Sequence, residues 1–415
     1  MVDNVYGNTS RATGDSTHGQ NTVVHFYDKA GVRAANTISV YAQHADRRSM
    51  PLKMGTTYKV SKWLHPYDRE TDAAEFSAKG YLTARSIVDV TAGLDDSALS
   101  EGAGAVNKRT IKKVTIETNF ARYGEMIDYS DEVDMFAEDV VQVHYREELG
   151  HMANRKAEDL IQLDMLATTT VMYSGTATSL ATIGNGVDAA DGSDDDLGRV
   201  SYDLIRKATR KLVRNRAEKT TSMVTGSTKI DTRTVNRAFY AIIGPEVKYD
   251  LENQTRGSAN EAEFVYIPVN KYGSAANLAE GEVGAMNDMR FVESESQVTY
   301  AGAGAEVPDG YVGQLANTTL DAATATALNA FTGTTVYADG QTRFDAFPIL
   351  IPTKGSFATV GLKGHGKIKF NSKSPKQVEL INPYGTQGFF SYNMWYAGII
   401  LREERLLKVL VAASS

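Results

Sequence analysis

The chain has 415 residues and a formal net charge of −7, with 42% hydrophobic and 23% charged residues. This balance is typical of globular proteins, so we expect a packed core, and the length allows two or three domains or one elongated body. The chain has no cysteine, which excludes disulfides, thiolate nucleophiles and cysteine zinc sites and fits a reducing compartment. The acidic charge argues against a protein that grips nucleic acid tightly.

The N-terminal part is polar. Residues 1–21 predict an extended or disordered arm, with no basic-then-apolar leader pattern. No apolar run in the chain approaches the roughly 20 residues that a bilayer span needs. Residues 28–46 predict a helix, although Gly31 and the β-branched residues weaken it. A strand is expected next in TTYKVSKWLHPY, residues 56–67, ending at Pro66.

A long polar stretch separates this strand from the next strong pattern. Residues 68–108 are acidic and rich in small residues, with one plausible strand in ARSIVDVTA, residues 84–92. The chain then returns in a strand-like alternation over residues 110–130. Two long strands with a wandering segment between them predict an extended hairpin rather than a compact domain.

The strongest local pattern runs from Asp131 to about Thr168, a stretch without proline and with one glycine, Gly150. Ser130 can cap a helix there, and acidic residues fill its first turn, where the helix dipole favours them. We predict one nearly continuous helix of about 55 Å, a spine for other elements, with a bend allowed at Gly150. Its predicted apolar face comprises Val133, Phe136, Val140, Met152, Leu160, Leu163 and Ala167.

The middle of the chain alternates helices and strands. Residues 184–198 form an acidic loop whose aspartates lack the fixed spacing of an EF-hand calcium site. Residues 201–219 predict an amphipathic helix with a dense basic face. Residues 237–253 predict a buried strand, a turn and a helix opened by Pro245 at its first position.

The last third of the chain is mainly strand-like. Strand patterns cover residues 289–300 and 347–362, and the Ala-, Thr- and Gly-rich residues 301–345 between them indicate an insertion. The C-terminal residues 388–412 predict a long strand to about Ile400, a charged turn and a closing strand.

Two glycine loops look like phosphate cradles, VTYAGAGAEV at residues 298–307 and EGAGAVNKRT at 101–110. A Walker loop requires Gly-Lys-Ser/Thr at its end, but Asn107 and Arg109 flank the lysine of the second loop. In the first loop Val307 stands where a dinucleotide fingerprint has its third glycine. We therefore interpret both as mobile, close-turning loops without a ligand.

The segment HYREELGH offers a possible metal site, because its ligand-type side chains fall near one helix face. They are His144, Glu147, Glu148 and His151. Glu148 and His151 match half of a di-iron carboxylate motif, but a second such pair and two further glutamates are missing. We predict that this charged side faces solvent or another subunit and binds no metal. The sequence predicts no catalytic, cofactor-binding or metal-binding residue and no cofactor.

Four segments, in order from about residue 120 to the end, carry a resemblance to a known family. They are YGEMIDYSDEVDMFAEDVV (123–141), FYAIIGPEVKYDLEN (239–253), MRFVESESQVTYAGAGA (289–305) and NPYGTQGFFSYNMWYAGIILREERLLKV (382–409). In these segments and in element order the chain resembles tailed-phage major capsid proteins of the Hong Kong 97-type fold, closest to the Schitoviridae-type podophage family. The first 50 residues, 68–108 and 305–345 match poorly.

The resemblance implies an α+β, Hong Kong 97-like capsid fold. Its expected parts are an N-terminal arm at 1–52, an E-loop-like extended hairpin at 53–118, a P-domain with the spine helix at 119–200, an A-domain with the insertion 301–345 at 201–370, and return strands completing the P-domain at 371–415. The loop at 298–307 would then belong to the A-domain.

The implied function is structural and not enzymatic. Copies of the chain would self-assemble into hexamers and pentamers of an icosahedral shell that encloses double-stranded DNA without sequence-specific contact. Scaffolding, portal and decoration proteins are the other implied partners, no membrane is involved, and assembly is expected in the bacterial cytoplasm before the chain becomes part of the virion capsid. Two alternatives stay open: a cytosolic α/β enzyme with a substrate loop at 301–345, and a phage tail or decoration protein.

Overall fold

The structure of the chain is a computed structural model. It describes residues 40–63, 87, 91, 113–136, 141–185, 198–224, 232–256, 261–262, 265–266, 279, 281–309, 311, 313–318, 322–332, 340–363, 368–375 and 383–415. No helix in this described part is long and apolar enough to cross a membrane.

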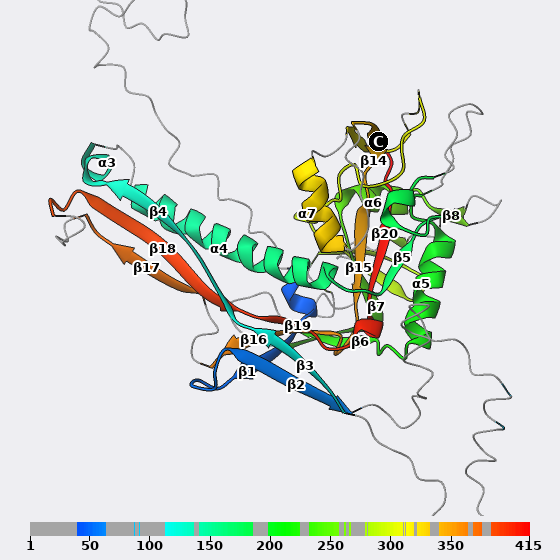
Figure 1. The fold of residues 1–415 in the computed structure, drawn as a ribbon, viewed down its shortest axis with the longest axis horizontal. Helices are drawn as coiled ribbons and strands as arrows, with labels where there is room; N and C mark the ends of the chain where they lie inside the picture. Colours follow the sequence, from blue (N-terminus) through cyan, green and yellow to red (C-terminus); the bar gives the residue numbers. More distant parts are fainter. Residues whose placement is uncertain are drawn as a thin grey trace, which may run out of the picture.

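An eight-stranded mixed sheet forms the body of the molecule (Figure 1). Its order is β10 (Val265–Tyr266), β11 (Glu282–Met286), β12 (Met289–Glu293), β7 (Thr232–Ile243), β15 (Phe347–Pro352), β20 (Leu406–Val411) and β5 (Val171–Tyr173), with β6 (Thr220–Val224) paired to β7. Every residue of β15 and β20 is buried. Strands with apolar residues on both faces are expected where both faces of a sheet are covered.

Helices and turns cover both faces of this sheet. Alternate residues of β7, β15 and β20 pack under α5 (Tyr202–Arg214) and α6 (Pro245–Glu252) on one face. The intervening residues pack against the C-terminal end of α4 (Val141–Leu166) and the 3-10 turn η2 (Ala42–His44) on the other. At one end of the sheet, α7 (Ala322–Thr332) and η3 (Leu180–Thr182) close a smaller cluster.

A second, elongated part leaves this body, and we call it the extension (Figure 1). It consists of a three-stranded antiparallel sheet, β17–β18–β4, together with α4 and the short helix α3 (Asp131–Phe136). The strand bounds are Lys369–Lys373, Gln387–Tyr396 and Ala121–Ser130. Aromatic residues Tyr129, Phe390 and Tyr392 pack under α4 against Leu149 and Ala153.

Shorter sheets surround the place where the two parts meet. β2 (Thr57–Trp63) and β3 (Lys113–Asn119) form an antiparallel hairpin pair, while β1 (Asp46–Met50), β16 (Phe357–Leu362) and β19 (Gly398–Ile400) form a three-stranded sheet. Two small pairs, β8 (Thr255–Arg256) with β9 (Glu261–Ala262) and β13 (Ala316–Thr318) with β14 (Thr342–Phe344), and the turn η7 (Glu403–Arg405) complete the described elements.

Two local predictions near the N-terminus are wrong over the residues that the structure describes. The described end of the helix predicted for 28–46 holds only η2, and Asp46 opens a strand that pairs in parallel with β16. This tertiary pairing overrides a weak helix propensity, while residues 1–39 lie outside the described residues. In the strand predicted for 84–92, Ile87 and Thr91 are helical, and the Thr91 hydroxyl donates to the Ile87 carbonyl at 3.1 Å.

The spine helix is confirmed over α4, whose 26 residues include Gly150 and extend for about 39 Å. Residues 137–140 lie outside the described residues, so continuity with α3 stays a prediction. The predicted apolar face is wrong: Met152, Leu163 and Ala167 are exposed. The buried stripe is Leu149, Ala153, Glu158, Ile161, Gln162, Met165 and Leu166. Because Glu158 and Gln162 in this stripe are polar, a hydropathy pattern does not reveal it.

Two long strand patterns are each interrupted once. The alternation over residues 110–130 breaks at Phe120, so that β3 pairs with β2 whereas β4 pairs with β18. The predicted C-terminal strand likewise breaks at Ala397 between β18 and β19. Each break lets one run of sequence serve both the extension and the small sheets beside the body.

Candidate assembly surfaces

The glycine loop at 298–307 is packed, so its interpretation as a mobile loop is wrong. The backbone N–H of Gly302 donates to Asp345 Oδ1 at 2.7 Å, and that of Gly304 donates to the Phe344 carbonyl at 2.8 Å. A Cβ at Gly304 would lie 2.8 Å from that same carbonyl, which explains the glycine. These amides already have partners, so they cannot cradle a phosphate. The twin loop at 101–110 lies outside the described residues.

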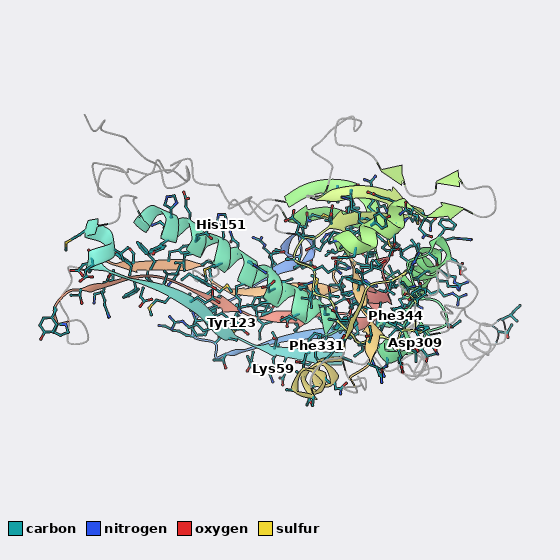
Figure 2. The ribbon with its side chains drawn as sticks, turned by 90° about the horizontal axis from the view of Figure 1, so that it is seen from above. Lys59, Tyr123, His151, Asp309, Phe331 and Phe344 are labelled. Carbon is teal, nitrogen blue, oxygen red and sulfur yellow. The ribbon has the colours of Figure 1, made fainter. Side chains whose placement is uncertain are left out.

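The possible metal ligands of α4 lie at the surface. His144, Glu147 and Glu148 are exposed and His151 is half-buried, and Figure 2 labels His151 on the helix. Across the described ranges, no three His, Asp or Glu side chains are placed to share a metal ion. The acidic loop 184–198 lies mostly outside the described residues.

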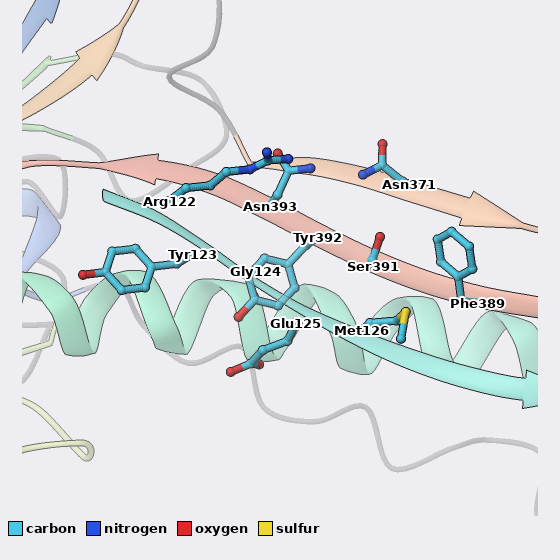
Figure 3. A pocket seen from close by; sticks show the side chains of 10 residues that line it. All are labelled: Arg122, Tyr123, Gly124, Glu125, Met126, Asn371, Phe389, Ser391, Tyr392 and Asn393. Carbon is cyan, nitrogen blue, oxygen red and sulfur yellow. The ribbon is translucent and has the colours of Figure 1, made fainter. Parts of the chain in front are cut away.

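No element that the structure describes covers the outer face of the β17–β18–β4 sheet. Strand β18 alternates between buried residues under α4 and partly exposed residues on the other face. Met126 of β4 is 63% exposed, and the Arg122 guanidinium lies 5.7 Å from the ring centre of Trp395. A hollow of about 590 Å³ lies on these strands. In Figure 3, the side chains of Asn371, Ser391 and Asn393 extend away from α4. An unenclosed surface of this kind suits a flat protein partner better than a small molecule.

The β2–β3 hairpin has an anchored base and an exposed outer side. Thr118 Oγ1 donates to the Gly398 carbonyl at 2.8 Å, and Lys62 Nζ donates to the Leu401 carbonyl at 3.3 Å. On the outer side, Lys59 and Glu117 form an exposed ion pair at 2.8 Å. The hairpin is thus fixed to β19 and the residue after it, while most of its side chains stay available for contact.

Buried polar residues join α4 to the N-terminal segment. Glu158 is 7% exposed and accepts hydrogen bonds from the backbone N–H of Tyr41 at 2.7 Å and of Ala42 at 3.3 Å. The Tyr41 hydroxyl lies 2.9 Å from the Gln162 side-chain amide. Burial raises the pKa of Tyr41, so the phenol stays protonated. A buried carboxylate with two backbone donors fixes where this segment crosses the helix.

The C-terminal end of α4 is joined to the body by charges. Lys408 Nζ donates to the Leu166 carbonyl at 2.8 Å, where a cation interacts favourably with the helix dipole. Burial lowers the pKa of Lys408 to about 8, and the Glu403 carboxylate opposes this shift. Glu403 also accepts hydrogen bonds from the Thr168 hydroxyl at 3.0 Å and the Thr169 N–H at 3.1 Å.

One further contact links α4 to β18. Tyr396 donates its hydroxyl proton to Asp164 Oδ2 at 2.7 Å. Burial raises the pKa of Asp164 and the hydrogen bond from Tyr396 opposes it, while burial and the neighbouring carboxylate raise the pKa of Tyr396. Trp395 and Tyr396 are successive residues of β18 and face opposite sides of the strand, since Trp395 is 37% exposed whereas Tyr396 packs against the core. These α4 junctions were missed in the sequence, where isolated acids on a helix look like solvent-facing residues.

Comparison with known proteins gives a consistent result, although no family model matches the chain. The chain is 26% identical to the major capsid protein of Pseudomonas phage KPP21 over 96% of this chain and 95% of that protein. Its fold is similar to the capsid chain of Ralstonia phage GP4, with a TM-score of 0.52 and 11% identity, covering 97% of this chain and 99% of that one.

A third similarity is to a chain of the head structure of Helicobacter pylori bacteriophage KHP40, with a TM-score of 0.50 and 9% identity, covering 99% of this chain and 98% of that one. At these identities the solved structures establish a shared fold. The similarity to a major capsid protein over 96% of this chain sets aside the alternatives of an enzyme and of a tail or decoration protein. Similarity over nearly the full length of both sequences, on a fold shared with phage capsids, gives this chain the structural role of a major capsid protein of a tailed phage.

Proposed function

We propose that the chain folds as a Hong Kong 97-type subunit and builds the hexamers and pentamers of an icosahedral shell around double-stranded DNA. The observation that carries this proposal is the extension itself, in which α4 lies along one face of the β17–β18–β4 sheet and both continue into a separate body (Figure 1). An elongated subunit of this kind can lie across its neighbours while its body stays folded.

The parts of the chain take the following roles in this proposal. They are the N-terminal arm at 1–52, the E-loop-like hairpin at 53–118 with β2 and β3 at its base, the P-domain with α4 at 119–200, the A-domain with the insertion at 201–370, and the return strands at 371–415. Return strand β18 supports this division, because it pairs with β4 of the P-domain. Strand β20 lies between β5 of the P-domain and β15 of the A-domain and joins the two parts.

We also propose the partners of the chain, its place of assembly and its group within the tailed phages. Scaffolding and portal proteins, and decoration proteins where the phage has them, are the expected partners, and assembly takes place in the host cytoplasm. The net charge of −7 suits a container whose wall must let DNA move during filling. Within the tailed phages, the four segments at residues 123–141, 239–253, 289–305 and 382–409 together favour a relationship to the Schitoviridae-type podophages.

Electron microscopy of the purified protein, alone and with its scaffolding partner, tests the proposal. Closed shells with six-fold and five-fold clusters are expected. A truncation before Leu406 should abolish folding and assembly because it removes β20, whose six residues are all buried between β15 and β5. A truncation of residues 1–10 is the control and should be milder. Small discrete oligomers under every condition would contradict the proposed assembly.

A further inference from the structure

The basic face of α5 stands out in an acidic protein. Residues 199–219 contain eight Lys and Arg against two Asp and Glu, a net charge of +6. The chain as a whole carries −7, so the remaining residues carry −13. Figure 1 shows α5 at the edge of the body far from the outer end of the extension. This concentration of positive charge has no role in the contacts described above.

The helix is held in place by its inner face, so its outer face is free to carry charge. Leu204, Ile205, Ala208 and Leu212 are buried against the sheet, and the Ser201 hydroxyl caps the first turn by accepting from the Leu204 N–H at 3.2 Å. Substitutions on the opposite side therefore leave the core contacts of α5 intact.

On the outer face, Arg206, Arg210 and Arg214 are exposed and follow one another at four-residue spacing. The rise of the helix places successive residues of this row about 6 Å apart along the axis, and like charges at this spacing repel each other. Arg206 lies 5.6 Å from the ring centre of Tyr202. Arg210 and Arg214 form no ion pair with any residue that the structure describes. We call these three residues the basic ridge.

Exposed apolar side chains also occur on the helices of this face of the sheet. Val213 lies next to Arg214 in the sequence and is 57% exposed, and Tyr249 of α6, which packs on the same face of the sheet, is 60% exposed. Protein interfaces combine an apolar centre with charged residues around it, whereas contacts to a nucleic-acid backbone draw mainly on positive and polar groups. The mixture favours a protein partner.

We propose that the basic ridge of α5 docks against an acidic surface of a second copy of this chain. The proposal rests on the proposed function, because a closed ring of identical subunits places one surface of each copy against a different surface of the next. A second copy offers the opposite charge, since its residues outside 199–219 carry a net −13. In the free subunit the ridge charges repel each other, and docking gives them carboxylate partners.

The test compares the wild type with a triple variant, Arg206→Gln, Arg210→Gln and Arg214→Gln, and with a control triple variant that places Lys at the same positions. Assembly is followed by light scattering between 0.05 and about 0.5 M salt, where the screening length falls severalfold. We expect the Gln variant to assemble about tenfold more slowly than the wild type at low salt and to lose most of the salt dependence. The Lys variant should keep both. Circular dichroism checks that all three proteins are folded.

A thiol probe locates the contact independently. The chain has no cysteine, so Val213→Cys introduces a single reactive site beside the ridge. The thiol should react with a maleimide in the free subunit and be protected in shells assembled without nucleic acid. Equal reactivity in both states would overturn the proposal, as would a Gln variant that assembles like the wild type at every salt concentration.

Two further outcomes distinguish docking between copies from nucleic-acid binding and from a failure of the proposed function. A Gln variant that assembles normally but retains less DNA would assign the ridge to nucleic acid and overturn docking between copies. A wild type that forms no closed shell would overturn the proposed function and the docking with it, whereas normal wild-type shells with an unaffected Gln variant would overturn the docking alone.

Discussion

The body and the extension bury their strands in different ways. In the body, all residues of β15 and β20 are buried, because helices or turns cover both faces of the sheet. In the extension, β18 is buried only at alternate residues, because α4 covers one face and no described element covers the other. Described elements thus cover both faces of the body sheet, whereas none of them covers the outer face of the extension, which leaves that face available to a neighbour.

This difference predicts where substitutions affect the subunit and where they affect the shell. Changes inside the body should lower the stability of the isolated subunit. Changes on the open face of the extension should leave that stability nearly unchanged and act on assembly. Glu158, Lys408 and Glu403 lie at the α4 junctions, where the extension meets the body. Changes there should affect both the stability of the subunit and its assembly.

The largest expected effect comes from a core substitution in the body. Phe291 is fully buried, so Phe291→Ala removes most of a packed aromatic side chain and should lower the free energy of unfolding by about 3–5 kcal/mol. Phe370 of β17 is the matched control, because it is 52% exposed. Phe370→Ala should change the stability of the subunit by about 1 kcal/mol or less. Urea denaturation of both variants measures this difference, and similar losses would contradict the contrast between the two regions.

An effect of similar size is expected inside α4. Leu160→Pro removes an internal hydrogen bond and creates a clash with the preceding turn, at a cost of about 3 kcal/mol or more. The substitution should also reduce assembly, because α4 backs the sheet of the extension. Leu160→Ala keeps the helix and serves as the control. A Leu160→Pro protein that is soluble and assembles normally would show that α4 is not needed as a spine.

How far the sequence predicted this fold depends on what each segment contacts. The helix at α5 and the strand, turn and helix around Pro245 were predictable, because amphipathic spacing and a first-turn proline are local signals. The breaks at Phe120 and Ala397 were not, because each reflects a change of pairing partner that only the tertiary structure reveals.

The surface sites show the same limit. The exposure of His144 agrees with the charged side predicted for α4, but the buried Glu158 could not be predicted from its own helix. Its partners are backbone N–H groups more than 100 residues earlier in the chain. The basic face of α5 was visible in the sequence. Only the fold shows that Arg210 and Arg214 form no ion pair with any described residue.

Acidification should weaken the body through His44. This residue lies in η2, its ring is 5.8 Å from that of Tyr240, and burial lowers its pKa to about 3. The folded state therefore holds neutral His44 between pH 6.5 and 3, whereas the unfolded state binds a proton, so stability is full above pH 6.5 and falls as the pH drops. The loss is about 1.4 kcal/mol per pH unit, or about 2 kcal/mol at pH 5.

Thermal unfolding of the wild type and of His44→Phe at pH 7.5, 6 and 5 measures this contribution. Relative to the wild type, the Phe variant should become more stable with each step down in pH, because it has no group to protonate. A stability difference that is the same at all three pH values would show that His44 does not report on the acid sensitivity of the body.

The smallest expected effect is on the outer side of the β2–β3 hairpin. Lys59 and Glu117 are both more than 60% exposed, so their ion pair is screened by water and salt. Lys59→Gln should therefore change subunit stability by about 0.5 kcal/mol or less. Thr118→Val is the informative contrast, because the Thr118 hydroxyl donates to the Gly398 carbonyl at the anchored base, where losing a partly buried hydrogen bond costs about 1 kcal/mol.

If the hairpin is a contact surface, Lys59→Gln should slow assembly at low salt while leaving the unfolding midpoint of the free subunit in place. A larger stability loss for Lys59→Gln than for Thr118→Val would mean that the outer side of the hairpin is held by the subunit itself and is not available to a neighbour.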